Sequence, residues 1–243
     1  MSQFARRLES GNFVGAARVL REVNPLSEIC GYICPAERLC EKKCSRLEFD
    51  SRPVRIRDLH RWVCGHVGGF EGWDRRMAPR NGLKVAVVGA GPAGLSCAHY
   101  LARLGYLVDI FEKAGKPGGM LTHGIPDFRL PSEVVEREFG GLCLPGMSFE
   151  YGKALGQDFS VAELERKYQA LFLAPGLWSG RTLAIPGLEK LKTSDALSFL
   201  KFCREAGRGE VGKDVVVIGG GSVASDVALS AVRSGARRVC LVC

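Results

Sequence analysis

The pattern of apolar and polar positions divides the chain into a helical first third and an α/β remainder. Residues 2–23 show helical spacing in two stretches separated by Gly11, and Asn24-Pro25 ends the second stretch. The segment 54–67 fits both a strand and a helix, and we interpret it as helical. Residues 70–82 have mixed charge, Gly and Pro but no periodicity, which predicts a linker.

After Leu83, short apolar runs alternate with glycine turns and helical spacing. Residues 83–113 are predicted to form a buried strand, a glycine turn, a helix and a second strand, and residues 213–243 repeat this order. A further strand followed by a glycine turn is predicted within 168–176. The two copies lie too far apart for a solenoid repeat, so the pattern predicts an α/β chain with two Rossmann-like dinucleotide-binding units.

The composition agrees with a globular protein that has material for a core. The chain has 243 residues, of which 46% are hydrophobic and 25% charged. It contains no apolar run long enough for a membrane span and no secretory signal, which predicts a cytoplasmic protein without a membrane partner. The net charge is +8, but the basic residues are spread out and no stripe with stacking aromatics is present, so nucleic acid is not expected as a partner.

The first glycine turn has the spacing of a dinucleotide fingerprint. Gly89 permits the sharp turn, Gly91 lets a pyrophosphate approach the backbone, and Gly94 lets helix and strand pack closely. Glu112 follows 18 residues after Gly94, where a carboxylate can accept hydrogen bonds from ribose hydroxyls. The alternative is an empty βαβ turn that only uses glycine. The predicted cofactor-binding residues here are Gly89, Ala90, Gly91, Pro92, Ala93, Gly94, Glu112 and Lys113.

The second glycine turn, Gly219, Gly221 and Ala224, has the variant spacing in which Ala replaces the third Gly. The sequence ends at Cys243, in the strand after which NADH and NADPH sites differ, so the two nucleotides are not separated. One βαβ unit cannot cover both faces of a parallel sheet. We therefore expect the chain to be a fragment whose last part exposes apolar surface.

Four of the ten cysteines, Cys30, Cys34, Cys40 and Cys44, lie within fifteen positions. In an intracellular α/β protein, clustered cysteines favour a metal site. Their spacing and the Pro after Cys34 favour an iron–sulfur cluster over zinc, and ordinary core cysteines are the third alternative. The other six are interpreted as packing residues: Cys64, Cys97, Cys143, Cys203, Cys240 and Cys243.

The joint order of several motifs resembles one family. The segments "NPLSEICGYICPAERLCEKKC", "GAGPAGL", "FEK", "PGGMLTHGIPDFRLP", "FLAPG" and "VIGGGSVASDVA" resemble the small (beta) subunit of glutamate synthase and its relatives, including the N-terminal part of dihydropyrimidine dehydrogenase. The resemblance covers nearly the whole chain. It implies domains at 1–78 for iron–sulfur clusters, 79–187 for the first part of an FAD domain, and 188–243 for the start of an NAD(P) domain.

The resemblance also implies roles for residues outside the first turn. Residues beside the flavin would be Gly118, Gly119, Met120, Leu121, Ile125, Pro126, Arg129, Ala174 and Gly176. The nicotinamide-nucleotide site would consist of Gly219, Gly220, Gly221, Ser222, Val223, Ala224 and Asp226. The [4Fe–4S] ligands would come from Cys30, Cys34, Cys40 and Cys44.

The sequence departs from the family at three places. Pro175 stands where the family has Thr, and Ser222 where it usually has Asn. In relatives, cysteines upstream of the segment that starts at Met1 complete two clusters, and the counterpart of Cys30 need not be a ligand. His60 falls where relatives carry a Gln or Glu that can complete a cluster, although an ordinary partly buried histidine is favoured there.

The expected activity is therefore electron transfer from NAD(P)H through FAD and [4Fe–4S] clusters to a partner, without a catalytic side chain. The expected partner is the glutamate synthase large subunit or another electron-acceptor subunit. Pyrimidine reduction and ferredoxin:NADP oxidoreduction are alternatives with the same chemistry. A non-catalytic dinucleotide-binding fragment is an alternative of a different class.

Overall fold

The chain forms two compact units in a computed structural model that describes residues 2–68, 73–180 and 183–243. Unit 1 comprises Met1–Gly118 and Ser132–Ala174, and unit 2 comprises Gly119–Pro131 and Pro175–Cys243. Unit 2 thus takes a short segment from the middle of the chain. Each unit is described by itself, and the domain boundaries expected at residues 78 and 187 stay a prediction.

The first part of unit 1 is helical, as the spacing predicts. Gly11 adopts φ +72° between the first two helices, and the Asn12 side chain caps the second by accepting from Gly15 N–H at 2.8 Å. Asn24 ends that helix just before Pro25. The helices are α1 (Ser2–Glu9), α2 (Phe13–Val23), α3 (Ser27–Ile33) and α4 (Ile56–His66), with 3₁₀ turns at Ala36–Arg38 and Ser45–Glu48.

A four-stranded parallel sheet forms the rest of unit 1 together with its covering helices. The strand order is β3-β2-β1-β4, so β1 lies inside the sheet, and four of its five residues are buried. The strands are β1 (Lys84–Val88), β2 (Leu107–Glu112), β3 (Met147–Tyr151) and β4 (Ala170–Leu173).

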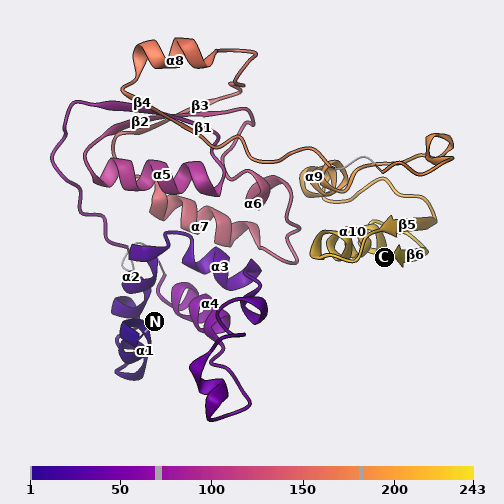
Figure 1. Cartoon of the computed structure of the whole chain (residues 1–243), viewed down its shortest axis with the longest axis horizontal. Coiled ribbons are helices and arrows are strands. Elements are labelled where there is room, and N and C mark those ends of the chain that lie inside the picture. Colours follow the sequence, from indigo (N-terminus) through magenta and orange to yellow (C-terminus); the bar gives the residue numbers. More distant parts are fainter. Residues whose placement is uncertain (1, 69–72, 181–182) are drawn as a thin grey trace. The chain divides into compact units, whose positions relative to one another are not determined.

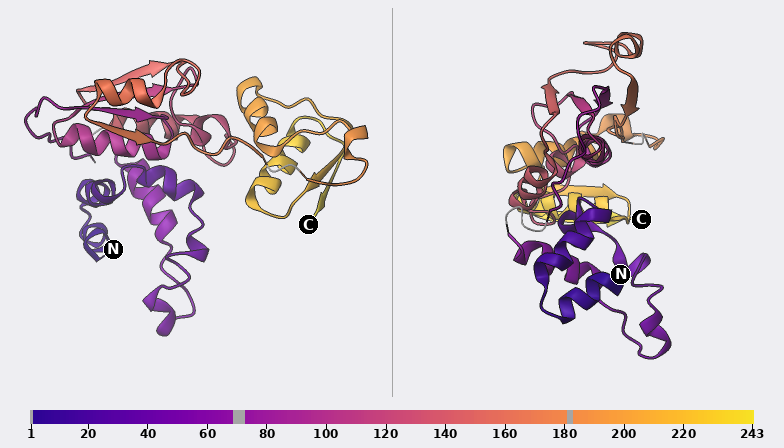
Figure 2. Two further views of the ribbon diagram at one scale, coloured as in Figure 1. Left: turned by 45° about the horizontal axis from the view of Figure 1, so that its top comes forward. Right: turned by 90° about the vertical axis from the view of Figure 1, so that its left-hand side faces the viewer.

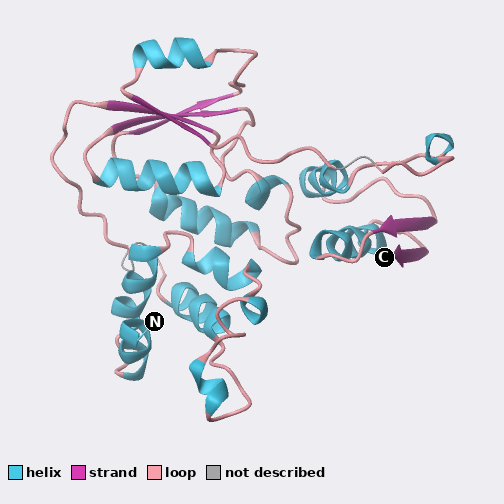
Figure 3. Ribbon diagram, in the orientation of Figure 1, coloured by secondary structure: helices cyan, strands magenta, loops and turns pink. Residues whose placement is uncertain are grey.

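Helices cover both faces of this sheet, as expected for a parallel α/β fold. Figures 1 and 3 show α5 (Pro92–Arg103) and α7 (Ser132–Leu142) on one face and α8 (Val161–Lys167) on the other. The views in Figures 1 and 2 place α1–α4 on the side of α5 and α7. On the other side, Leu164 of α8 is buried with Ala86 and Val88 of β1.

The described residues of unit 2 form one βαβ element, which follows two α-helices. The unit's elements are α6 (Met120–His123), a 3₁₀ turn (Leu188–Lys190), α9 (Ala196–Ala206), β5 (Asp214–Ile218), α10 (Ser222–Arg233) and β6 (Arg238–Val242). Leu200 of α9, Val217 of β5 and Val227 of α10 belong to its buried core. The parallel strands β5 and β6 expose apolar side chains, with Val216 65% and Val242 50% exposed. The expected apolar surface in this part of the chain is present.

The predicted fold class, strands and glycine turns are confirmed, and 54–67 is helical. Two expectations were less accurate. In the predicted linker, 69–72 lie outside the described residues, but Trp73 is buried beside His99 and Gly141. Cys64 is a core residue and three other scattered cysteines are partly buried. In the last strand Val239 packs against the core of unit 2, but Cys240 and Cys243 are exposed.

Candidate functional site

The first glycine turn joins the end of β1 to the start of α5. Gly89 has φ +101°, in the region that favours glycine, and Gly91 caps α5 with no side chain above it. Pro92 occupies the first turn of the helix. The first N–H groups of an α-helix lack partners within the helix and carry its positive dipole end. The turn therefore presents backbone donors suited to an anionic pyrophosphate.

Gly94 has the close packing that the third glycine of the fingerprint requires. A Cβ at this position would lie 1.9 Å from the Gly89 carbonyl oxygen and 3.2 Å from Val87 Cγ1. No side chain fits between helix and strand there. The glycine keeps the N-terminus of α5 close to the end of β1.

The Glu112 carboxylate lies at the mouth of this turn. Its Oε2 accepts a hydrogen bond from Ala90 N–H at 2.7 Å, and its Oε1 accepts from Ala114 N–H at 2.8 Å. Each oxygen keeps a further lone pair that can accept from a hydroxyl. The half-buried carboxylate is thus held by two backbone donors with acceptor capacity for a ribose diol.

Further predicted residues of unit 1 lie at the same edge of the sheet. Ala174 N–H donates to the Val88 carbonyl at 2.7 Å, and Gly118 N–H donates to the Ala90 carbonyl at 2.7 Å. Lys113 follows Glu112 and is exposed. Since β1 pairs with β2 on one side and β4 on the other, this edge is the topological switch point, where open parallel sheets bind their ligands.

The second glycine turn, in unit 2, has a similar backbone. Gly219 has φ +132°, and its N–H donates to the Val242 carbonyl at 2.7 Å. A Cβ at Gly221 would meet nothing within 4 Å. Ala224 is buried, as expected for the position that packs helix on strand. Gly220, Ser222 and Val223 are exposed around the start of α10. This helix start can accept a second dinucleotide.

Arg129 and Asp226 form an ion pair that sequence reasoning missed. Arg129 Nε donates to Asp226 Oδ1 at 2.7 Å, and its second nitrogen, Nη2, lies 2.7 Å from the same oxygen. Asp226 is 7% exposed, in the second turn of α10. The sequence assigned Arg129 to the flavin and Asp226 to the nicotinamide nucleotide. The structure brings the two together, and no spacing signal connects residues 97 positions apart.

The segment that carries Arg129 also holds most of the other predicted flavin residues of unit 2. Gly119 precedes α6 with φ +54°, and Met120 and Leu121 form its first turn. Ile125 N–H donates to the Met120 carbonyl at 2.9 Å, and the Pro126 carbonyl accepts from Arg129 N–H at 2.9 Å. Gly176, with φ +73°, follows β4. Leu121 and Pro126 are buried, and the roles of this group stay a prediction.

Two of the four clustered thiols receive hydrogen bonds from nitrogen. Asn24 Nδ2 donates to Cys30 Sγ at 3.2 Å, and Val54 N–H donates to Cys44 Sγ at 3.5 Å. Donors directed at sulfur are a feature of iron–sulfur ligation and tune its potential. This donor set fits the predicted group.

In the absence of a metal, the surroundings of Cys30 and Cys34 favour the protonated thiol over the thiolate. Burial, followed by the proximity of Cys30 and Cys40, raises the pKa of Cys34, and burial raises the pKa of Cys30. A cationic metal centre would relieve this repulsion. Among the residues that the structure describes, no three Cys, His, Asp or Glu side chains converge on a metal position. The expectation that further ligands are needed stays a prediction.

His60 is packed edge-on against Phe4, with ring centroids 5.2 Å apart. Its Nε2 is buried without a hydrogen-bond partner in the described part of the chain, and burial lowers the pKa of the ring. The histidine is therefore neutral at pH 7, which suits both a packed core ring and a metal ligand.

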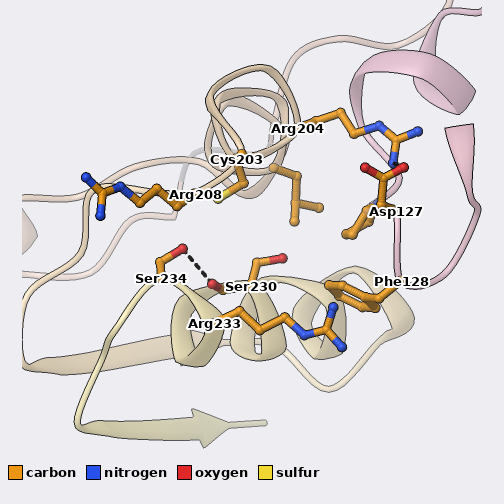
Figure 4. A pocket seen from close by; sticks show the side chains of 11 residues that line it. Asp127, Phe128, Cys203, Arg204, Arg208, Ser230, Arg233 and Ser234 are labelled. Atoms are coloured by element: carbon orange, nitrogen blue, oxygen red, sulfur yellow. Dashed lines mark hydrogen bonds and ion pairs between the residues drawn. The ribbon is translucent and has the colours of Figure 1, made fainter.

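A cavity of about 140 Å³ lies elsewhere in unit 2. Figure 4 shows it between the last turns of α9 and α10, with the Cys203 thiol facing it. At its rim Arg204 pairs with Asp127, and the Arg233 guanidinium lies 4.2 Å from the centre of the Phe128 ring. The cavity is at the opposite end of α10 from the glycine turn, so it is not the predicted nucleotide site.

Comparison with known families agrees with this geometry. Residues 83–243, which include both glycine turns, match the profile described as pyridine nucleotide-disulphide oxidoreductase. The chain belongs to the pyridine nucleotide-disulphide oxidoreductase family. Residues 1–68, which include the four cysteines, match the profile described as dihydropyrimidine dehydrogenase domain II, 4Fe-4S cluster.

Curated relatives align with nearly all of this chain. The PreT subunit of NAD-dependent dihydropyrimidine dehydrogenase from Salmonella typhimurium is 37% identical over 228 residues, covering 93% of this chain and 54% of its own length. The small chain of NADPH glutamate synthase from Azospirillum brasilense is 35% identical over 243 residues, covering 94% and 50%. The beta subunit of a Geobacter sulfurreducens NADPH-Fe(3+) oxidoreductase is 37% identical over 235 residues, covering 92% and 34%.

A solved structure, Mycobacterium tuberculosis FprA in complex with NADPH, is 29% identical, with a TM-score of 0.52 over 62% of this chain and 36% of FprA. These matches confirm the predicted resemblance and the cofactor set of FAD, NAD(P)H and a [4Fe–4S] cluster. The chain spans about half the length of the first curated relatives, at 54% and 50%. No helix among its described residues combines the length and apolar character needed to cross a membrane.

Proposed function

We propose that this chain carries the cofactor sites of an NAD(P)H-dependent electron-transfer oxidoreductase. When bound, FAD accepts a hydride from NAD(P)H and the iron–sulfur clusters accept electrons singly. The observation that supports this most is the position of Glu112. Its carboxylate is held by Ala90 N–H beside the glycine turn, at the switch point of a parallel sheet.

In this proposal the chain binds and orients the adenosine diphosphate part of FAD through backbone groups. The start of α5 donates to the pyrophosphate, and Glu112 accepts from the ribose. Gly91, at the cap of α5, carries no side chain that would stand between the phosphates and the backbone, and the close packing of Gly94 holds helix and strand together. The same arrangement around Gly219–Ala224 would bind the nicotinamide nucleotide. No side chain needs to move a proton for these roles.

The clustered cysteines would supply thiolate ligands to [4Fe–4S] clusters. Cys30 and Cys44, whose sulfur atoms accept hydrogen bonds, and Cys34 and Cys40 near them are the residues concerned. Their matching profile is a 4Fe-4S domain. The chain would thereby hold both the flavin and ligands of the cluster that accepts its electrons.

The electron acceptor is proposed to be a partner subunit. Relatives named as parts of dihydropyrimidine dehydrogenase, glutamate synthase and an Fe(3+) oxidoreductase are 35–37% identical to the chain, so identity favours no one acceptor. The glutamate synthase large subunit and another acceptor subunit both remain candidates. Co-purification of a subunit with glutaminase activity would support the first.

The proposal is tested by the visible spectrum and activity of the purified protein. We expect flavin bands near 450 nm and iron–sulfur absorption after anaerobic reconstitution, and reduction of both by NADH or NADPH. A protein that stays colourless with added FAD, iron and sulfide would support a non-catalytic dinucleotide-binding role instead.

A further inference from the structure

Unit 1 contains a group of four charged side chains, three of them buried, that neither dinucleotide fingerprint explains. We call Arg21 of α2, Glu28 of α3, and Arg137 and Glu138 of α7 the charged clamp. Arg21, Glu28 and Glu138 are at most 2% exposed. The two acids and two bases balance in charge, and they join helices from the first 33 residues to a helix that covers the sheet.

Glu138 contacts the start of the cysteine-bearing helix. Its Oε2 accepts from Glu28 N–H at 3.0 Å and from Ile29 N–H at 3.4 Å, while its Oε1 accepts from Arg21 Nε at 3.2 Å. The residue that precedes α3, Leu26, provides no side-chain cap. Glu138 therefore caps α3 from a helix 110 positions further along the chain.

Arg137 makes the reciprocal contact. Its guanidinium donates to both carboxylate oxygens of Glu28, with Nε at 3.1 Å from Oε2. Two adjacent residues of α7 thus bind α3. Glu138 accepts hydrogen bonds from its first backbone N–H groups, and Arg137 forms an ion pair with the Glu28 carboxylate. Figure 1 shows α3 lying beside α7.

Arg21 connects these contacts between α3 and α7 to the helices α2 and α4. Its Nη2 donates to the Cys64 carbonyl of α4 at 3.4 Å, and its guanidinium lies 4.9 Å from the centre of the Trp73 ring. One carboxylate, Glu138, and one guanidinium, Arg21, therefore contact α2, α3, α4 and α7.

Such an arrangement is not the simplest way to join two helices. Apolar residues of similar volume commonly stabilise a buried position as well as an ion pair does, so buried charges are better explained by the specific geometry that they select. Here the geometry selected is that of α3, which carries Cys30 and ends at Cys34.

We propose that Arg137 and Glu138 are positioning residues that fix the cysteine-bearing helix α3 against α7, which lies on the same face of the sheet as α5. This rests on the proposed function, because it assigns the clamp to placing the cluster ligands for electron transfer from the flavin. Small displacements of reacting groups reduce rates steeply, so a helix that carries ligands must be held tightly.

The test compares E138Q and R137M with E136Q, a matched change on the exposed side of the same helix. Gln at 138 keeps the size of the side chain but offers one acceptor oxygen instead of two. R137M keeps the apolar part of a half-exposed side chain and leaves Glu138 in place. These two variants avoid the truncation that would leave Arg21 buried beside a void.

The first measurement is amide hydrogen exchange of the purified chain, which needs no cofactor. We expect the α3 amides, Glu28 and Ile29 first, to exchange about tenfold faster in E138Q and R137M than in the wild type. The β1 and β2 amides should be unchanged, and E136Q should match the wild type throughout. Equal α3 exchange in all four proteins, or faster exchange spread evenly over unit 1, would overturn the proposal.

The second measurement separates positioning from general stability in the reconstituted protein. In E138Q and R137M we expect cluster reduction after flavin reduction to slow at least about threefold, with the rate of flavin reduction by NAD(P)H unchanged. The cluster signal in electron paramagnetic resonance should broaden. Cluster reduction at the wild-type rate with faster α3 exchange would overturn the assignment to electron transfer. A wild type that binds neither flavin nor cluster would refute the proposed function, while the exchange result would still decide whether the clamp holds α3.

Discussion

At the scale of single residues, glycine has two different roles in the two turns: Gly94 allows close packing, and Gly221 leaves space for a ligand. Gly94 faces the Gly89 carbonyl, whereas a side chain at Gly221 would enter open space. The fold itself requires glycine at position 94. At position 221, glycine is required only if a ligand approaches the turn.

Gly94→Ala should therefore destabilise the protein even without cofactor. The new Cβ would lie 1.9 Å from a backbone oxygen, so α5 must shift away from β1. We expect the free energy of unfolding to fall by about 1–3 kcal/mol. Urea denaturation followed by circular dichroism measures this change, and a variant as stable as the wild type would show that the helix and strand are less closely packed than described.

Gly221→Ala should affect ligand binding but not stability. Its φ of −85° suits any residue and its surroundings are open, so stability should change by less than about 1 kcal/mol. Affinity for NAD(P)H should nevertheless fall, because the Cβ would occupy the approach of the pyrophosphate. Isothermal titration with both nucleotides tests this. Unchanged affinity would place the nucleotide elsewhere.

Glu138 gives the protein a pH-dependent stability. Burial raises its pKa from 4.5 to about 7 despite the nearby Arg21. The folded state therefore holds the proton more tightly than the unfolded state, so the stability associated with protonation is present below pH 4.5 and lost as pH rises through about 7.

The comparison with Glu138→Gln measures that effect. Between about pH 5 and pH 8, the free energy of unfolding of the wild type should fall relative to that of the Gln variant by on the order of 1–3 kcal/mol. Urea titrations at both pH values give the two differences. A difference that does not vary with pH would mean that Glu138 is ionised across the whole range.

At the scale of elements, the strands and glycine turns were predictable because their apolar runs are short and end at glycine. The apolar pattern did not predict β3 and α7, which lie between β2 and β4. In β3 no residue is fully buried, and α7 buries Glu138 on its inner face, so the apolar period is weak in both. The pairings Glu138 with α3 and Arg129 with Asp226 depend on the tertiary fold, and local spacing carries no signal for them.

The start of α9 is an element boundary that can be tested by itself. Asp195 accepts from Leu197 N–H at 3.0 Å and from Ser198 N–H at 3.1 Å, and these hydrogen bonds lower the pKa of its carboxyl group. Asp195→Ala should reduce the free energy of unfolding by about 1 kcal/mol, and Asp195→Asn by less.

The pH dependence of this cap follows from its lowered pKa. The carboxylate contributes stability above its unfolded-state pKa of about 3.8, and the contribution is lost as pH falls through the lower folded-state value. Thermal unfolding of the wild type and the Ala variant at about pH 7 and pH 3 tests this. The difference between their unfolding temperatures should be smaller at pH 3 than at pH 7. Curves equally far apart at both would show that the cap does not act through its charge.

At the scale of the whole molecule, the described residues combine a four-stranded sheet with one βαβ element. Unit 1 covers both faces of its four strands, while unit 2 exposes apolar side chains on β5 and β6. The curated relatives named above are longer, and the chain aligns with 34–54% of them. The predicted flavin residues are divided between the units, with Gly89–Gly94 and Glu112 in unit 1 and Gly119–Arg129 in unit 2.

The central claim is that the Glu112 carboxylate and the adjacent glycine turn bind the adenosine diphosphate part of FAD. Titration of the purified chain with FAD, followed by flavin fluorescence, tests it most directly in the wild type, Glu112→Ala and the exposed control Glu165→Ala. We predict one FAD per chain for the wild type and the control, and at least about tenfold weaker binding for Glu112→Ala, equivalent to about 1.4 kcal/mol. Equal affinity in all three proteins, or no binding by the wild type, would contradict the claim.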